Sequence, residues 1–231
     1  MIMITSRIIG LVLGYIFGLF PTGKIVGKAY HTDLQKSGSG NTGMTNSIRV
    51  LGWKAGVIVF FGDCLKAAAA MLIVWLLYRD VYPDAVKMLE LYAGVGAVLG
   101  HNFPVYAKFR GGKGIASSVG IVFGFDWRMV PVCAALFFLS VAPTGFMSLG
   151  SLGILSGFFI QTIVFGQMGW LKVASELLPE VYVLSGILTG LAFWQHRANL
   201  KRLASGTENK FAPAKKKGKE EQQENPEGKS K

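Results

Sequence analysis

The chain alternates long apolar segments with short polar loops. A helix needs roughly 20 apolar residues to cross a bilayer core of about 30 Å. Five segments have that length and few charges, and they cover residues 4–22, 55–77, 85–106, 148–168 and 179–195. The pattern therefore predicts an all-α polytopic membrane protein.

The region between residues 113 and 148 leaves two arrangements open. It holds two shorter apolar pieces, 115–125 and 129–143, which are separated by the polar turn Phe125-Asp126-Trp127-Arg128. As helices these pieces rise only about 16 to 22 Å. They form either two short or tilted spans, which gives about seven transmembrane helices, or a re-entrant pair inserted among five. Both counts are odd and place the termini on opposite sides.

The loops differ in charge, and short cytoplasmic loops carry the excess of Lys and Arg. One set of loops holds most of the cations: Lys24, Lys28, Lys36, Arg49, Lys54, Lys108, Arg110, Lys113, Arg197, Lys201 and Arg202. The other set holds Arg79, Lys87, Arg128 and Lys172, mostly near acidic residues. The N-terminus is therefore predicted outside and the C-terminus in the cytoplasm. Every polar motif then lies on the cytoplasmic face.

Composition narrows the class of protein. Hydrophobic residues make up 51% of the sequence, and the formal net charge is +11. Nucleic acid is not expected as a partner, because many cations lie near the C-terminus or beside apolar segments, where they set topology and attract anionic lipid. Cys64 and Cys133 are isolated, and the carboxylates are few and scattered, so neither a metal nor another cofactor is expected. Residues 1–206 are predicted to form one membrane-embedded domain, followed by a disordered, charged cytoplasmic tail over 207–231.

Four polar clusters share the predicted cytoplasmic face. They cover residues 18–28, 37–49, 100–114, and 148–151 together with 196–202. Hydroxyls, small amides, glycines and cations are the groups that bind a phosphate-bearing ligand at a membrane surface. Asp63 and Lys66 are interpreted as an ion pair that lowers the cost of buried charge, and His101 as a hydrogen-bonded interface residue. From these residues alone, an enzyme and a transporter or binding protein for a phosphorylated solute remain open.

Three of these elements resemble the signature regions of the PlsY family, the bacterial acyl-phosphate:glycerol-3-phosphate acyltransferases. The first is Ser37-Gly38-Ser39-Gly40-Asn41-Thr42-Gly43-Met44-Thr45-Asn46 with Arg49. The second joins Gly100-His101 and Pro104 to Phe109-Arg110-Gly111-Gly112-Lys113-Gly114, and the third is His196-Arg197-x-Asn199 with Arg202. The similarity covers about residues 10 to 208.

The resemblance implies an integral membrane enzyme of the bacterial plasma membrane with its active site facing the cytoplasm. Such an enzyme transfers a fatty acyl group from acyl phosphate to the 1-hydroxyl of glycerol 3-phosphate, the first acylation of phospholipid synthesis. The products are lysophosphatidate and inorganic phosphate. The resemblance also implies contact with membrane lipids and functional coupling to the enzyme that forms acyl phosphate.

The resemblance assigns site residues position by position. Ser39, Arg49, Lys113, His196 and Asn199 match the glycerol 3-phosphate site, and the first four of these are the candidate catalytic residues. Thr45, Asn46, Gly111, Gly112 and Ser148 match positions around the acyl phosphate, and Arg110 adds charge there. The implied transfer is direct, without an acyl-enzyme. Either a substrate phosphate accepts the hydroxyl proton or a protein base does, for which His196 is the candidate.

Overall fold

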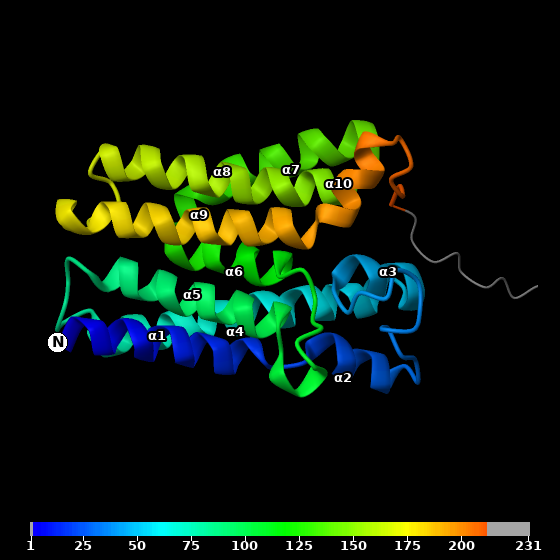
Figure 1. Cartoon of the computed structure of the whole chain (residues 1–231), viewed down its shortest axis with the longest axis horizontal. Helices are drawn as coiled ribbons and strands as arrows, with labels where there is room; N and C mark the ends of the chain where they lie inside the picture. The colour runs from blue at the N-terminus through cyan, green and yellow to red at the C-terminus, as the bar shows by residue number, and fades with distance from the viewer. Residues whose placement is uncertain (1, 212–231) are drawn as a thin grey trace, which may run out of the picture.

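The computed structural model describes residues 2–211, and every regular element in this range is a helix. The longer helices run side by side along the long axis of the molecule (Figure 1): α1 (Ile2–Gly18), α4 (Trp53–Tyr78), α5 (Val86–Asn102), α6 (Ile115–Phe125), α7 (Val130–Thr144), α8 (Met147–Gln167) and α9 (Leu178–Gln195). Short helices gather at one end: α2 (Thr22–Ala29), α3 (Met44–Leu51) and α10 (Arg197–Ala204). Single turns of 3-10 helix, η1 (Val105–Ala107), η2 (Trp127–Met129) and η3 (Ser175–Leu177), lie in the connections.

The helices confirm the prediction of a polytopic all-α membrane protein. Within the described range, five helical segments are long and apolar enough to cross a bilayer: Met3–Ala29, Trp53–Tyr78, Trp127–Thr144, Met147–Gln167 and Ser175–Gln195. This set differs from the predicted one, because α5 has 17 residues and is shorter than the predicted segment 85–106. It ends before Pro104, since the residue that precedes a proline is pushed away from helical geometry.

Helices α6 and α7 occupy the region where two arrangements were open. Asp126 ends α6 and accepts a hydrogen bond from the backbone N–H of Arg128, which starts the next turn. The Arg128 guanidinium donates to the carbonyl of Trp170, 3.0 Å away in the α8–α9 connection. The turn between α6 and α7 therefore lies beside the α8–α9 connection, at the end of the bundle opposite α10 (Figure 1).

The helices pack in two groups. Helix α1 packs against α4 and α5, with α6 beside α4, whereas α7, α8 and α9 form the other group (Figure 1). Close approach of α1 and α5 requires glycine, because a Cβ at Gly14 would lie 1.9 Å from the carbonyl oxygen of Ala93. Small residues at helix contacts are the usual means of tight packing in membranes. Contacts of α5 with α9 and of α6 with α8 join the two groups.

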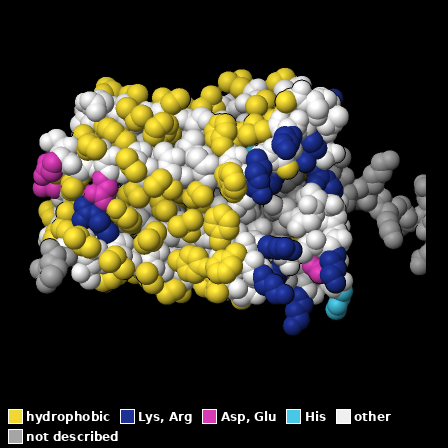
Figure 2. Space-filling model, in the orientation of Figure 1, with side chains coloured by type: hydrophobic (Ala, Val, Ile, Leu, Met, Phe, Trp, Pro, Cys, Tyr) yellow, Lys and Arg dark blue, Asp and Glu magenta, His cyan; other side chains and the backbone are white. Residues whose placement is uncertain are grey.

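The sides of the bundle are apolar and its two ends are polar. Large side chains such as Ile8, Leu72, Leu139 and Val183 are exposed on the sides. Hydrophobic residues cover the middle of the face in Figure 2, and charged residues lie at both ends. This is the distribution that a bilayer imposes, because charge inside the hydrocarbon is costly.

The ends of the described chain lie at opposite ends of the bundle, since α1 begins at one end and α10 lies at the other (Figure 1). The first residues of the predicted tail contact the helical domain. The backbone N–H of Phe211 donates to the carbonyl of Gly145, and its ring packs edge-on against Trp53. Residues 207–211 therefore pack on the helical domain. The rest of the predicted tail, 212–231, lies outside the described residues.

Candidate active site

The loop between α2 and α3 is organised by the side chain of Asn46. Asn46 is buried in the first turn of α3, and its amide nitrogen lies 2.7–3.2 Å from the carbonyl oxygens of Leu34, Ser37 and Asn41. Its amide oxygen accepts the backbone N–H of Ser39 at 2.8 Å. These bonds occupy the polar atoms of Asn46 and leave Ser39 exposed at the surface of the loop.

The turn from Lys108 to Gly114, here called the basic turn, is fastened to the end of α5. The N–H of Gly111 donates to the carbonyl of Asn102 at 3.0 Å, and the N–H of Gly112 donates to the carbonyl of His101 at 3.1 Å. A Cβ at Gly111 would lie 1.9 Å from the carbonyl oxygen of His101, so the turn needs glycine there. Since both amides are already bonded, the charged groups that the turn offers an anion are the side chains of Lys108, Arg110 and Lys113.

Lys113 is directed across the end of the bundle toward α10. Its ammonium donates to the side-chain oxygen of Asn199 at 2.5 Å. The amide of Asn199 then donates to Glu208 at 2.6 Å. Glu208 also accepts from Ser148 at 2.8 Å and from Arg202 at 2.8 Å. The carboxylate thus fixes the orientation of Asn199 and Ser148, and Asn199 holds Lys113.

Burial sets the charge balance at this network. The pKa of Lys113 is lowered to about 8: burial is the largest cause, Glu208 opposes it, and the nearby charges of Arg202 and Arg49 add to it. For Glu208, burial favours a higher pKa, but hydrogen bonds from Asn199, Ser148 and Arg202 outweigh it and leave the pKa below its ordinary value. Glu208 is therefore ionised at neutral pH, and the ammonium of Lys113 becomes more favourable when an anion binds beside it.

His196 lies at the end of α9 and is 2% exposed. Its Nδ1 is 2.8 Å from the carbonyl oxygen of Ala192. A carbonyl only accepts, so Nδ1 carries the proton and Nε2 is left as an acceptor. Burial, together with the charge of Lys113, lowers the pKa of His196 to about 4. The ring is neutral at physiological pH and can accept a hydrogen bond from a hydroxyl.

The comparisons with known proteins agree with this arrangement. A family profile described as glycerol-3-phosphate acyltransferase matches residues 8–206. The chain belongs to the glycerol-3-phosphate acyltransferase family. An acyltransferase of this name from Bacillus velezensis is 40% identical over 202 residues, which cover 87% of this chain and 95% of the relative. The enzyme from Bacillus subtilis is 39% identical over 203 residues, with 87% and 95% covered.

Comparison with solved structures indicates the same family. Two crystal structures of PlsY, an integral membrane glycerol 3-phosphate acyltransferase, superpose with TM-scores of 0.77 and 0.76 at 29% identity. They cover 90% of this chain and 96% of PlsY, and are described as its glycerol 3-phosphate and lysophosphatidic acid forms. The alternative of a transporter for a phosphorylated solute, which the residues alone left open, gives way to membership of an acyltransferase family.

In this acyltransferase, the structure brings several of the predicted site residues together. Lys113, Asn199 and Ser148 belong to one hydrogen-bonded network. The charge of Arg49 lowers the pKa of Lys113, and the charge of Lys113 lowers the pKa of His196. Ser39, Thr45 and Arg110 lie in the loops and helix starts at the same end, without a hydrogen bond from their side chains to that network in the described residues.

Glu208 is the member of the network that sequence reasoning missed. It follows Gly206 and Thr207, just after α10, and it looks like the start of a solvated charged tail. The only signal in the sequence is a lone carboxylate a few residues after Asn199 and Arg202.

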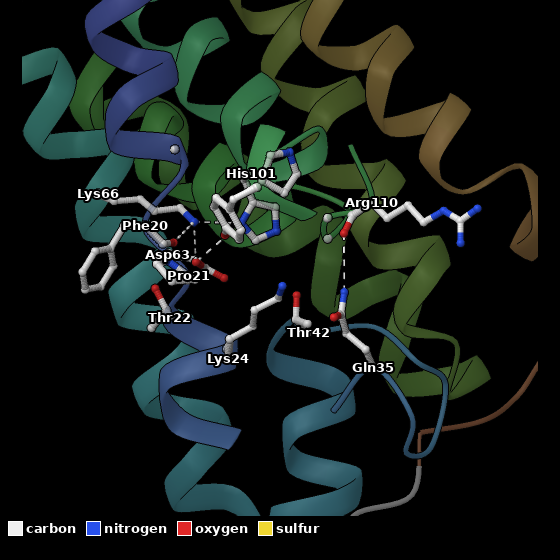
Figure 3. Close-up of a pocket in the computed structure, with 16 residues that line it drawn as sticks. Phe20, Pro21, Thr22, Lys24, Gln35, Thr42, Asp63, Lys66, His101 and Arg110 are labelled. Carbon is white, nitrogen blue, oxygen red and sulfur yellow. Dashed lines mark hydrogen bonds and ion pairs between the residues drawn. The ribbon is translucent and has the colours of Figure 1, made fainter. Parts of the chain in front are cut away.

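The acyltransferase has a second polar cluster beside the basic turn. Asp63 and Lys66 form an ion pair of 2.7 Å between nearly buried side chains, as the sequence interpretation expected, and His101 joins them. They line a cavity of about 20 Å³, large enough for one water molecule, together with Thr22, Lys24 and Thr42 (Figure 3). The guanidinium of Arg110 extends away from this cavity in Figure 3, and its carbonyl faces Gln35.

Proposed function

We propose that this acyltransferase uses acyl phosphate as its donor and makes lysophosphatidate from glycerol 3-phosphate at the cytoplasmic face of the bacterial plasma membrane. The observation that carries the proposal is the ammonium of Lys113, held by Asn199 and surrounded by Arg49 and Arg202. Both proposed substrates bear a phosphoryl group, and a cation fixed by hydrogen bonds is suited to orient one.

The reaction is a direct transfer. The 1-hydroxyl oxygen of glycerol 3-phosphate forms a bond to the acyl carbon, and the bond from that carbon to the phosphate oxygen breaks. Phosphate is a good leaving group, so alignment and stabilisation of the developing oxyanion are the main demands on the protein. Ser39, Arg49, Lys113, His196 and Asn199 are assigned to glycerol 3-phosphate. Acyl phosphate is assigned to the remaining set: Thr45, Asn46, Arg110, Gly111, Gly112 and Ser148.

The assignments of Asn46, Gly111 and Gly112 are refined by their local contacts. The side chain of Asn46 and the backbone N–H groups of Gly111 and Gly112 form their hydrogen bonds with other groups of the protein. Their contribution is therefore to shape the loop and the basic turn around the substrates.

The hydroxyl proton goes to the departing phosphate, and His196 orients the hydroxyl. The free Nε2 of His196 accepts a hydrogen bond from the 1-hydroxyl, which points an oxygen lone pair at the acyl carbon. Because burial lowers its pKa to about 4, the imidazole does not keep a proton at neutral pH. A general base works best when its pKa lies near the working pH, so the phosphate is the better final acceptor.

The test is a donor assay with the full chain purified in lipid. Palmitoyl phosphate and labelled glycerol 3-phosphate should give lysophosphatidate without coenzyme A or acyl carrier protein. Product that forms only with acyl-CoA would contradict the proposed donor. Rates with freshly generated and pre-formed acyl phosphate would show whether function is coupled to the enzyme that makes this donor.

A further inference from the structure

The buried ammonium of Lys66 ties three elements of the fold together. The Lys66 side chain is 5% exposed, and its Nζ lies 2.7 Å from Asp63 Oδ1, 2.8 Å from His101 Nδ1 and 3.1 Å from the carbonyl oxygen of Phe20 (Figure 3). These acceptors come from α4, the end of α5 and the α1–α2 connection. The ammonium thus has two hydrogen-bond partners, His101 and Phe20, and a carboxylate counter-ion, Asp63.

The contact with Lys66 fixes the tautomer of His101. Because Nδ1 accepts from the ammonium, the ring proton lies on Nε2. The Nε2 edge faces the basic turn, since a Cβ at Gly112 would lie 2.1 Å from Nε2. The carbonyl of the same histidine accepts the N–H of Gly112 at 3.1 Å. His101 therefore holds the basic turn through both its backbone and its ring.

The basic turn in turn sets the position of Lys113. Lys113 follows Gly112 directly, and it reaches Asn199 across the end of the bundle. A chain of direct contacts thus leads from Lys66 through His101 and Gly112 to Lys113. A displacement of about 1 Å in a positioning contact can lower an enzymatic rate about 100-fold.

A second ion pair, between the partly buried Lys87 and the buried Glu90, has no such connection to Lys113 within the described residues and serves as a comparison. Lys87 and Glu90 in α5 also have the i, i+3 spacing, 3.5 Å apart, and Lys87 donates to the carbonyl of Phe125. They lie near the α6–α7 turn, at the far end from Lys113. Apolar side chains of similar volume often replace a buried ion pair without loss of stability.

We propose that Lys66 and His101 are positioning residues of the acyltransferase, which hold the basic turn so that Lys113 meets the phosphoryl group. The inference rests on the role proposed above for Lys113. It predicts that Lys66 and His101 act through Lys113 and make no contact with substrate.

The first experiment compares matched variants in the full chain. Lys66→Met should lower kcat/KM for glycerol 3-phosphate at least about ten-fold, whereas Lys87→Met, which also leaves a buried carboxylate unpaired, should change it less than about two-fold. His101→Gln keeps an acceptor for Lys66 and should retain most of the activity, and His101→Phe should behave like Lys66→Met. Equal losses in the Lys66 and Lys87 variants would overturn the proposal.

The second experiment follows Lys113 itself. The N-hydroxysuccinimide ester of acetate labels amines, and mass spectrometry reports the labelling rate of Lys113 against pH without any need for activity. The midpoint should lie near the lowered pKa of about 8 in the wild type. It should rise in His101→Phe and Lys66→Met as Lys113 gains contact with water, and stay unchanged in Lys87→Met. Unchanged midpoints in all variants would overturn the inference.

These outcomes separate the inference from the proposed function. Full activity in Lys113→Met would contradict the role of Lys113 itself. Loss of activity in Lys113→Met, with normal activity and labelling in Lys66→Met and His101→Phe, would overturn only the positioning role. If Lys66→Met does not fold, the two His101 variants and their labelling profiles decide.

Discussion

The two polar ends of the bundle differ in how far their cations are paired with carboxylates. At the end formed by the α4–α5 and α8–α9 connections, most cations are paired with carboxylates: Arg7 with Glu180, Arg79 with Asp80, Lys87 with Glu90, and Arg128 with Asp126. At the other end, Arg49 and Lys113 have no ion pair within the described residues, and dark blue side chains gather with little magenta in Figure 2.

The difference shows where an anion can bind. A paired cation must give up its carboxylate before it can hold a phosphate, whereas an unpaired cation gains a partner. Arg7 illustrates the first case, because its guanidinium contacts both carboxylate oxygens of Glu180, at 2.6 and 2.7 Å. Lys113 illustrates the second, since its ammonium bonds only a neutral amide oxygen, and burial makes an anionic partner more valuable.

Removal of the Lys113 charge should have the largest effect on activity. Lys113→Met is expected to lower kcat/KM for glycerol 3-phosphate about 1,000-fold, because a buried charge-assisted contact to the phosphoryl group is lost. Steady-state rates of lysophosphatidate formation measure this. Arg7→Met, at the other end, is the control. Loss of less than about ten-fold in Lys113→Met would contradict the assigned role.

Glu208 should have the next largest effect. Glu208→Gln removes the negative charge that accepts hydrogen bonds from Ser148, Asn199 and Arg202. Asn199 then loses its fixed orientation, and kcat/KM should fall about 30-fold, with a loss of about 1.5–3 kcal/mol in the free energy of unfolding. Rate measurements and thermal denaturation in lipid test both parts. Wild-type activity in Glu208→Gln would show that the carboxylate does not orient the site.

The pH dependence of kcat/KM tests the ionisation of Lys113. Lys113 binds an anion as an ammonium, the form present below its pKa of about 8. The value of kcat/KM, which reports on the free enzyme, should therefore be constant from about pH 7 to 8 and fall about ten-fold per pH unit above it. The same decline is expected in Arg7→Met. A profile that stays flat to about pH 10 would contradict the lowered pKa.

The fold was predictable where apolar length decides it. The predicted segments 55–77, 148–168 and 179–195 correspond to α4, α8 and α9, and the piece 115–125 coincides with α6. The bilayer requires these segments to be helical, whatever their neighbours. Helices α2, α3 and α10 were not predicted, because each has eight residues and forms through packing at the end of the bundle.

The site was predictable in its residues and less so in their contacts. Lys113 and Asn199 were named from motifs, but their direct contact joins residues far apart in sequence. Glu208 was not predicted as a site residue, because a carboxylate close to a lysine-rich segment is expected to be solvated when its partners are unknown. The bond between Lys66 and His101 depends on how α4 meets α5, which no periodicity in the sequence specifies.

A substitution at the end where cations are paired should have only a small effect on activity. Arg7→Met is expected to leave kcat/KM within about two-fold of the wild type and to lower the free energy of unfolding by up to about 1 kcal/mol, since Arg7 and Glu180 are partly exposed. Kinetics and thermal denaturation on the same preparation measure the two quantities. A loss of activity as large as that of Lys113→Met would erase the distinction between the ends.

The most direct test of the central claim is substrate protection of lysines in the unaltered protein. The N-hydroxysuccinimide ester of acetate is applied with and without saturating glycerol 3-phosphate, and mass spectrometry follows Lys113 and, at the paired end, the exposed Lys172. We predict that glycerol 3-phosphate slows acetylation of Lys113 at least about ten-fold and leaves Lys172 unchanged. Equal acetylation of Lys113 with and without the substrate would contradict a phosphate site at the unpaired cations.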